Sequence, residues 1–111
     1  MLHLCIVKIL SANIEQIKEI CATTGVRTLY AFGSVTNLKF KDDSDVDMVV
    51  DIAETDPIAY SEFYFTLKEH LEAVLNRHVD LLEQKAIKNP FLKKEIDQTK
   101  VLIYGNSKFR H

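Results

Sequence analysis

The chain has 111 residues, of which 47% are apolar and 27% are charged, and its formal net charge is -2. Such a length and composition are typical of one globular domain and exclude a second hydrophobic core. The charge lacks the basic field of a nucleic-acid-binding protein, and no apolar run approaches the ~18 residues of a membrane span. We therefore expect one cytoplasmic domain over residues 1–111, with a core at about 13–104 and a frayed tail at 105–111.

The N-terminal third of the chain predicts one helix. From Leu2 to Leu10 the apolar residues have no clear period, so a strand and a helix both stay open there. After Asn13 the apolar residues recur at helical spacing, and Gly25 is a typical residue for the end of a helix. Cys21 shares the apolar face of this helix and is expected to pack in the core.

Two strands and a polar connection follow. Residues 26–32 and 45–52 are rich in β-branched and apolar side chains, which are typical of strands. The polar segment 35–44 joins them. A connection of ten residues readily links antiparallel neighbours, so these two strands are expected to pair in opposite directions.

The remaining elements alternate between helix and strand. Asp56 and Pro57 mark the start of a long helix, as N-cap and first helical residue, and a wide apolar stripe continues to about Asn76. Residues 78–82 are the third expected strand. Asn89-Pro90 opens a short amphipathic helix, and residues 101–104 form either a last strand or the end of that helix.

Three aspartates stand in unusual positions. Aspartate is depleted in strands, yet Asp45 and Asp47 open the second predicted strand and Asp80 lies near the start of the third. Residues two apart on a strand share a face, roughly 6.5–7 Å apart. A long helix separates the two strands, and such crossovers join parallel strands. The three aspartates and the Gly33-Ser34 pair are therefore expected at one edge of one sheet.

These residue types together favour a metal-triphosphate site. Clustered carboxylates repel one another and need a cation to stay ionised, and their hard oxygen atoms suit Mg²⁺ or Mn²⁺. A glycine lets the backbone approach a phosphate closely, and the Ser34 hydroxyl adds a donor beside Gly33. The pattern indicates phosphoryl or nucleotidyl transfer with two metal ions held by Asp45, Asp47 and Asp80.

Each position also has an ordinary structural explanation. Asp45 alone could cap a turn, Asp47 could be an exposed edge residue, and Asp80 could pair with Arg77 or Lys85. Their coincidence at one sheet edge argues against the ordinary explanations taken together. Asp51 is interpreted as a solvated strand end and not as a ligand. His78 shares the strand face of Asp80 and could reach the site, but a structural or partly exposed role is favoured for it.

The residues that carry a family resemblance are Phe32-Gly33-Ser34, then ten residues, Ser44-Asp45-Val46-Asp47, and finally Val79-Asp80-Leu81. With this spacing the chain resembles the minimal nucleotidyltransferases of the polymerase-β-like superfamily, from about residue 25 to residue 104. The resemblance implies the nucleotidyltransferase fold, an α+β fold. In it a small mixed sheet, with an antiparallel strand pair and a parallel strand after a crossover helix, packs against helices.

The resemblance also implies roles for the matching positions. Asp45 and Asp47 would bind two Mg²⁺ ions that clamp the triphosphate of ATP, and Asp80 would share one ion and help to activate the acceptor hydroxyl. Ser34 and the backbone of Gly33 would hold the terminal phosphates. In the antitoxin branch of this family the acceptor is a tyrosine of a HEPN-domain toxin, which the transferred AMP blocks.

One segment departs from the family pattern. Members often carry Ala-Arg-Gly-Glu after the Gly-Ser pair, where this chain has Thr36-Asn37-Leu38-Lys39. Lys39 or Lys41 is expected to supply the missing positive charge to the nucleotide, as a point charge rather than a guanidinium fork. We expect Lys39 to contact the nucleotide.

Three functions are consistent with these observations. The favoured one is transfer of AMP from ATP to a hydroxyl of a partner protein, such as a HEPN toxin. A small-molecule acceptor bound across a homo-oligomer interface is the less favoured form of it. The alternatives are a catalytically weak antitoxin that acts by stoichiometric contact with its partner, and a nucleotide-sensing subunit. The cluster of three aspartates favours catalysis, because a simple binding module has no need of it.

Overall fold

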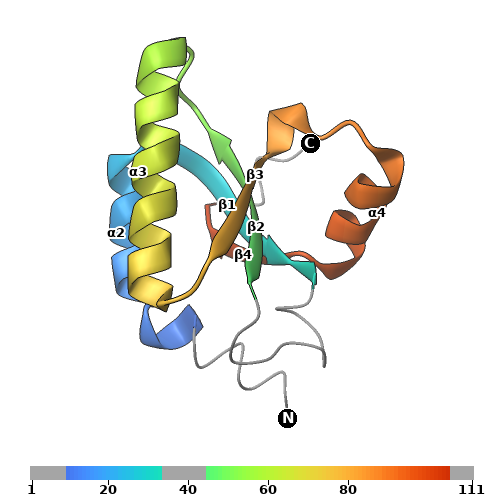
Figure 1. Cartoon of the computed structure of the whole chain (residues 1–111), viewed down its shortest axis with the longest axis horizontal. Helices are drawn as coiled ribbons and strands as arrows, with labels where there is room; N and C mark the ends of the chain where they lie inside the picture. The colour runs from blue at the N-terminus through green and yellow to red at the C-terminus, as the bar shows by residue number, and fades with distance from the viewer. Residues whose placement is uncertain (1–9, 34–44, 106–111) are drawn as a thin grey trace.

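The computed structural model describes residues 10–33 and 45–105 of the chain. In this part helices flank a four-stranded sheet (Figure 1). The boundaries given by the sequence pattern agree with the structure to within about one residue. The elements in chain order are α2 (Ile14–Thr23), β1 (Val26–Phe32), β2 (Val46–Ile52), α3 (Pro57–Leu75), β3 (Val79–Glu83), the 3₁₀ helix η2 (Gln84–Ala86), α4 (Pro90–Thr99) and β4 (Val101–Tyr104).

The sheet has the strand order β3-β2-β1-β4. Strand β1 runs antiparallel to both of its neighbours, β2 and β4, whereas β2 and β3 are parallel. The parallel pair follows from the chain path, because the crossover through α3 returns the chain to the edge at which β2 starts. The expected α+β class with a mixed sheet is confirmed, and residues 101–104 form a strand rather than a helix end.

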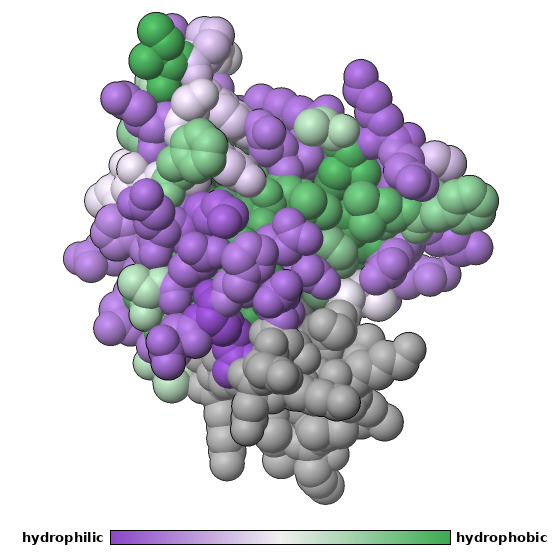
Figure 2. Space-filling model, viewed as in Figure 1, coloured by the Kyte–Doolittle hydropathy of each residue, from purple (hydrophilic) through white to green (hydrophobic). Residues whose placement is uncertain are grey.

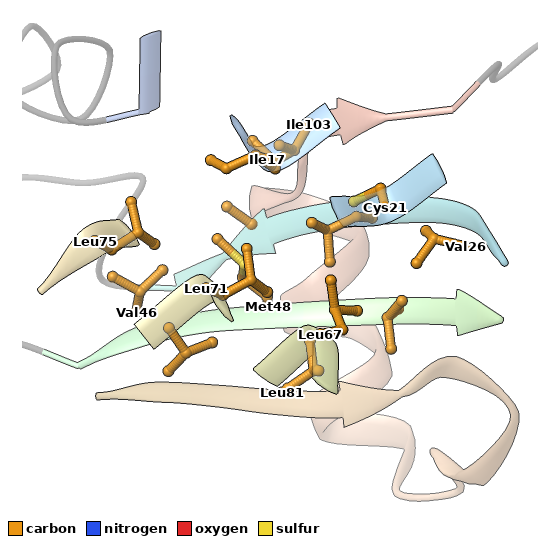
Figure 3. Packing of buried hydrophobic residues seen from close by; sticks show 14 of the residues in the cluster. Ile17, Cys21, Val26, Val46, Met48, Leu67, Leu71, Leu75, Leu81 and Ile103 are labelled. Carbon is orange, nitrogen blue, oxygen red and sulfur yellow. The ribbon is translucent and has the colours of Figure 1, made fainter. Parts of the chain in front are cut away.

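Helices α2 and α3 cover one face of the sheet, and the main core lies between these helices and the strands (Figure 1). Successive side chains of a strand point to opposite faces, so alternate residues of β2 enter this core. Burial raises the pKa of the Cys21 thiol to about 12, so the prediction that Cys21 is a packing residue is confirmed. Fully buried members of this core include Ile17, Cys21, Met48, Leu67 and Leu71 (Figure 3).

Helix α4 lies on the other face of the sheet (Figure 1). A second, smaller apolar cluster attaches it there. The buried members of this cluster are Tyr30, Phe32, Val49 and Ile96. Because Val49 faces α4, the residues two positions before and after it on β2, Asp47 and Asp51, lie on this same face. The α4 side of the sheet therefore carries the aspartates, and the side under α2 and α3 is apolar.

The helix ends follow their local sequence. The Asp56 carboxylate accepts a hydrogen bond from the Ala59 amide, and Pro57 takes the first helical position of α3, as predicted. Asn76 follows α3 in the left-handed conformation with φ of 54°. The Asn89 side chain accepts from the Phe91 amide at the start of α4. These caps hold the loops that lead into β3 and out of η2.

One sequence-based assignment is wrong. Asp51 was expected to be a solvated strand end, but its side chain is only 12% exposed. An Arg27 Nη1 atom lies 3.2 Å from Asp51 Oδ2, and Lys85 Nζ lies 3.8 Å from Oδ1. The reason is tertiary, because β1 and η2 bring two cations to the end of β2 that neighbouring sequence positions do not reveal. Lys85, considered as a partner of Asp80, pairs here with Asp51.

Some expectations fall outside the described residues. These are the ambiguous apolar segment up to residue 9, the polar connection over residues 35–44, and the tail from residue 106. None of the helices in the described ranges is long and apolar enough to cross a membrane.

Candidate active site

Two of the predicted site aspartates lie side by side. In the parallel register of β2 and β3, Asp47 is paired with Asp80, and each is the second residue of its strand. Their side chains share the α4 face of the sheet, where Asp47 is half-buried and Asp80 is exposed. The expected convergence of these two carboxylates at one sheet edge is confirmed.

Gly33 lies directly against Asp47. Strand β1 ends at Phe32, which is the cross-strand partner of Asp47, and the chain then turns through Gly33 with φ of +73°. A Cβ atom at this position would stand 3.0 Å from Asp47 Oδ2 and 3.6 Å from Glu95 Oε2. Glycine is therefore needed twice, for the backbone conformation and for the close approach of a carboxylate.

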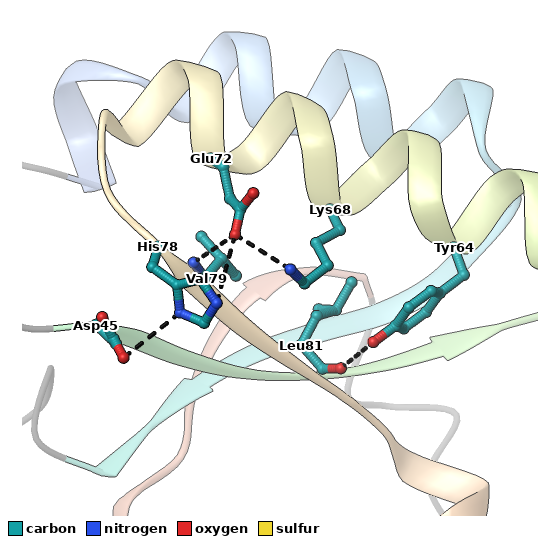
Figure 4. Close-up of polar contacts among 7 residues, drawn as sticks. All are labelled: Asp45, Tyr64, Lys68, Glu72, His78, Val79 and Leu81. Atoms are coloured by element: carbon teal, nitrogen blue, oxygen red, sulfur yellow. Dashed lines mark hydrogen bonds and ion pairs between the residues drawn. The ribbon is translucent and has the colours of Figure 1, made fainter.

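Asp45 lies at the same edge, because it is the residue directly before β2 in the chain. Its Oδ2 atom is 3.4 Å from His78 Nδ1, and His78 Nε2 is 3.9 Å from Glu72 Oε2 (Figure 4). The two residues meet because the Val46 amide donates to the His78 carbonyl, which aligns the starts of β2 and β3. The sequence analysis favoured a structural or partly exposed role for His78 over one at the site. Its side chain is 57% exposed, and it also contacts Asp45, a predicted metal ligand.

The electrostatics of the site centre on Asp47. Burial raises the pKa of its carboxyl above the ordinary value of 3.8. The negative charges of Asp80, Asp45 and Glu95 raise this pKa further, in that order, and His78 acts in the opposite direction. The edge of the sheet thus concentrates negative charge that a cation would relieve.

Glu95 is a site residue that the sequence analysis missed. It belongs to α4, far along the chain from the Gly-Ser and Asp-x-Asp pattern, and it reaches the site because Ile96 beside it packs into the second apolar cluster. No local spacing links Glu95 to Asp47. The only sequence signal was the amphipathic pattern of α4, which predicted a packed helix without saying on which face it packs.

The carboxylates of Asp45, Asp47 and Asp80 have the chemistry of ligands for a divalent metal ion, but their side chains do not converge on one point. Among the residues that the structure describes, no group of three His, Cys, Asp or Glu side chains is arranged to hold a metal ion. Asp45 is engaged with His78 instead of joining Asp47 and Asp80. Carboxylate oxygens are nevertheless the ligands that Mg²⁺ prefers, and the repulsion that raises the pKa of Asp47 is what such an ion would remove.

Only one of the residues predicted to contact the nucleotide belongs to the part of the chain that the structure describes. Gly33 is described, whereas Ser34 and Lys39 lie outside the described residues. A cavity of about 310 Å³ lies between α4 and the sheet and is lined in part by Tyr30 and Val49. This cross-strand pair lies two residues along the strands from the pair of Phe32 and Asp47, and neither Asp47 nor Asp80 lines the cavity. Its size lies within the range of small-molecule sites.

Glu72 connects the site to α3. Its carboxylate accepts hydrogen bonds from the Val79 amide at 3.1 Å and from Lys68 Nζ at 3.2 Å (Figure 4). The bond from Val79 and the neighbouring Lys68 lower the pKa of Glu72 below the ordinary value of 4.5. Glu72 therefore fixes the start of β3, and with it His78 and Asp80, against α3.

Replacing Glu72 by Ala is expected to lower the melting temperature at pH 7 by a few degrees, because the lowered pKa means that the folded state favours the carboxylate. This contribution is present above the ordinary pKa of 4.5 and is lost as the pH falls through the lower pKa of the folded state. Melting curves of both proteins from pH 7 to pH 3 test it. Glu69→Ala, an exposed neighbour on α3, is the control, and a deficit independent of pH would contradict this explanation.

The comparison with known families agrees with this geometry. The model of the nucleotidyltransferase family of polymerase beta matches residues 15–109. The chain belongs to this family. It is therefore a nucleotidyltransferase, and the resemblance seen in the sequence is confirmed.

Relatives and solved structures support the same assignment. The nucleotidyltransferase described here is 35% identical over 85 residues to the protein adenylyltransferase MntA of Thermococcus cleftensis, covering 77% of this chain and 80% of that one. A solved minimal nucleotidyltransferase has 27% identity and a TM-score of 0.67, covering 83% of this chain and 90% of the other. A chain in the complex of tri-AMPylated Shewanella oneidensis HEPN toxin with its MNT antitoxin shares the fold. That match has 22% identity, a TM-score of 0.60, and coverage of 89% of this chain and 75% of the other.

Proposed function

We propose that this nucleotidyltransferase moves AMP from ATP to a hydroxyl group of a partner protein, with Mg²⁺ as its metal. The observation that carries the proposal is the pairing of Asp47 with Asp80 under the Gly33 turn, at the edge where Asp45 precedes β2. This arrangement places carboxylates, which suit a metal-bound triphosphate, directly beside the turn that precedes Ser34 in the sequence.

In this proposal two Mg²⁺ ions would be held by Asp45, Asp47 and Asp80. Mn²⁺ ions could take their place. Bound there, the metal would supply positive charge to the phosphate oxygens during transfer. Asp45 contacts His78 through Oδ2, so its Oδ1 atom or a rotated side chain would bind the ion. Ser34, the Gly33 turn and Lys39 are assigned to the nucleotide. Because ATP is the donor, we place the reaction in the cytoplasm.

The chemical step is a substitution at the α-phosphorus of ATP. The acceptor hydroxyl oxygen forms a bond to the α-phosphorus, the bond from that phosphorus to the bridging oxygen of the β-phosphate breaks, and pyrophosphate leaves with the electron pair. The hydroxyl proton passes to the Asp80 carboxylate. The exposed position of Asp80, beside the half-buried Asp47, supports this division of roles, because a large acceptor can reach Asp80 from solvent.

The acceptor is assigned to a second protein, of the HEPN type. Two comparisons support this: one relative is named a protein adenylyltransferase, and the Shewanella oneidensis complex holds an AMPylated HEPN toxin. Apolar side chains gather between α3 and α4 on the face shown in Figure 2, where a groove is lined by Tyr64, Leu82 and Leu92. Phe91 on α4 is 82% exposed. A protein partner would cover such side chains.

Transfer from labelled ATP tests the proposal. Incubation with a HEPN-domain protein from the same organism and Mg²⁺ is expected to leave ³²P on that protein when the label is at the α-phosphate. No label should remain when it is at the γ-phosphate. Asp80→Asn is expected to reduce the rate about 10³-fold, equivalent to about 4 kcal/mol of transition-state stabilisation.

The matched control is Asp51→Asn, on the same strand and the same face as Asp47. Asp51 is held by Arg27 and Lys85 at the other end of β2, so this variant is expected to keep the wild-type rate. Retention of label from γ-labelled ATP, or equal rates for Asp80→Asn and wild type, would contradict the proposed reaction.

A further inference from the structure

A hydrogen bond joins the side chain of Thr99, at the end of helix α4, to the Gly33 turn. The Gly33 amide donates a hydrogen bond of 3.0 Å to Thr99 Oγ1. The sheet register explains the meeting, because β1 and β4 are antiparallel with Ala31 opposite Val101. Continuing this register by two residues places Gly33 opposite Thr99, which lies just before β4 and is the last residue of α4. A side-chain hydroxyl there replaces the carbonyl of a strand partner.

The Thr99 hydroxyl is held in this position from both sides. It accepts the Gly33 N–H and donates its own hydrogen to the Glu95 carbonyl at 2.8 Å. Both of its ordinary hydrogen-bonding roles are thereby used, which fixes the rotation of the hydroxyl. Ile96, which lies between Glu95 and Thr99 in the sequence, is buried and packs α4 against the sheet. The bond to Gly33 therefore comes from a rigid support.

This bond changes the expected role of Gly33. The sequence suggested that its backbone would hold phosphate, but the Gly33 amide already donates to Thr99. The contribution of Gly33 is then its position, with φ of +73° and with a Cβ atom at this place standing only 3.0 Å from Asp47 Oδ2. The bond from Thr99 therefore holds the Gly33 turn beside the Asp47 carboxylate.

We propose that Thr99 is a positioning residue for nucleotide binding. Its hydroxyl fixes the Gly33 turn, so that the triphosphate is received beside Asp47 and Asp80. This inference rests on the proposed nucleotidyl transfer. It differs from a merely structural role of Thr99, which would affect stability but not the affinity for nucleotide.

The test compares Thr99→Val, which keeps the shape and loses the hydroxyl, with Thr99→Ser, which keeps the hydroxyl. Calorimetric titration with Mg²⁺ and α,β-methylene-ATP, whose α–β linkage resists transfer, gives the Kd without an acceptor. Loss of the hydroxyl is expected to raise the Kd about tenfold, and Thr99→Ser is expected to stay within about twofold of wild type. Gln98→Ala, exposed on the same helix, is the control. A Thr99→Val Kd within about twofold of wild type overturns the inference.

Amide hydrogen exchange of Gly33, measured by NMR on the metal-free protein, gives a second readout. Exchange is expected to accelerate about tenfold in Thr99→Val and to stay slow in Thr99→Ser. Unchanged exchange in Thr99→Val overturns the role of the hydroxyl. If wild type binds no nucleotide while exchange at Gly33 responds as expected, it is the proposed transfer that fails and not the Thr99–Gly33 link.

Discussion

Replacing Asp47 by Asn is expected to slow nucleotidyl transfer strongly and, at the same time, to raise the melting temperature of the metal-free protein. The neutral amide has nearly the same shape but removes a carboxylate that is partly desolvated and repelled by Asp80, Asp45 and Glu95. The rate is expected to fall about 10³-fold. The gain in stability, reduced by solvent screening, is expected to be ~0.5 kcal/mol, or about 2–4 °C.

The pH dependence of this gain has a definite sign. The pKa of Asp47 is raised in the folded state, so ionising it costs stability, and that cost appears as the pH rises from the ordinary value of 3.8 through the higher pKa of the fold. Asp47→Asn is therefore more stable than wild type at pH 7, and the two proteins converge below about pH 3.8. Melting curves between pH 3 and pH 8 measure the difference.

Asp51→Asn is the control for this prediction, and it should have the opposite effect. Asp51 forms ion pairs with Arg27 and Lys85, so loss of its charge is expected to lower the melting temperature at pH 7. A lower melting temperature of Asp47→Asn at pH 7 would show that the Asp47 carboxylate is stabilised by its surroundings. That result would contradict the repulsion on which the metal site is argued.

Replacing Gly33 by Ala is the second prediction with a large expected effect, and Gly25→Ala is its matched control. Both glycines have φ near +70°, at +73° and +68°, so both variants carry a backbone penalty of about 1 kcal/mol. Their surroundings differ. Among the described residues, a Cβ at Gly25 would contact Phe63 at an ordinary 3.8 Å, whereas a Cβ at Gly33 would stand 3.0 Å from Asp47 Oδ2.

The two alanine variants are thus expected to have similar melting temperatures and very different activities. In Gly33→Ala the Asp47 carboxylate or the turn must shift by a few tenths of an ångström, and because catalysis depends steeply on the position of such a group, the rate is expected to fall about tenfold. Gly25→Ala is expected to keep the wild-type rate. Labelled transfer and thermal melting on the same preparations measure both quantities. Equal activity of the two variants would contradict a role for the close approach of Gly33 to Asp47.

Those parts of the fold that are encoded locally could be predicted from the sequence. Asp56 and Asn89 mark helix starts because their side chains accept hydrogen bonds from free amides of the first turn. Pro57 favours the first helical position because it has no N–H to satisfy and its φ already suits a helix. The parallel pairing of Asp47 with Asp80 could also be predicted, since a helical crossover between strands leaves little choice of direction.

The contributions of α4 and of the surrounding charges could not be predicted. Glu95 and Thr99 reach the site because α4 packs on the same face of the sheet as Asp47, and an amphipathic helix does not specify which face it covers. Asp51 was misjudged for a related reason. Its partners come from β1 and η2, so its burial depends on contacts between elements distant in sequence.

The most direct test of the metal-triphosphate site is the melting temperature measured with Mg²⁺ alone, with ATP alone and with both at millimolar concentration. A ligand at 100 times its Kd stabilises a folded protein by about 2.7 kcal/mol, which for a domain of this size is a rise of roughly 10–20 °C. The rise is expected to require both Mg²⁺ and ATP and to be absent in Asp47→Ala. An unchanged melting curve of the wild-type protein with both present would contradict the assignment of Asp45, Asp47 and Asp80 to a nucleotide site.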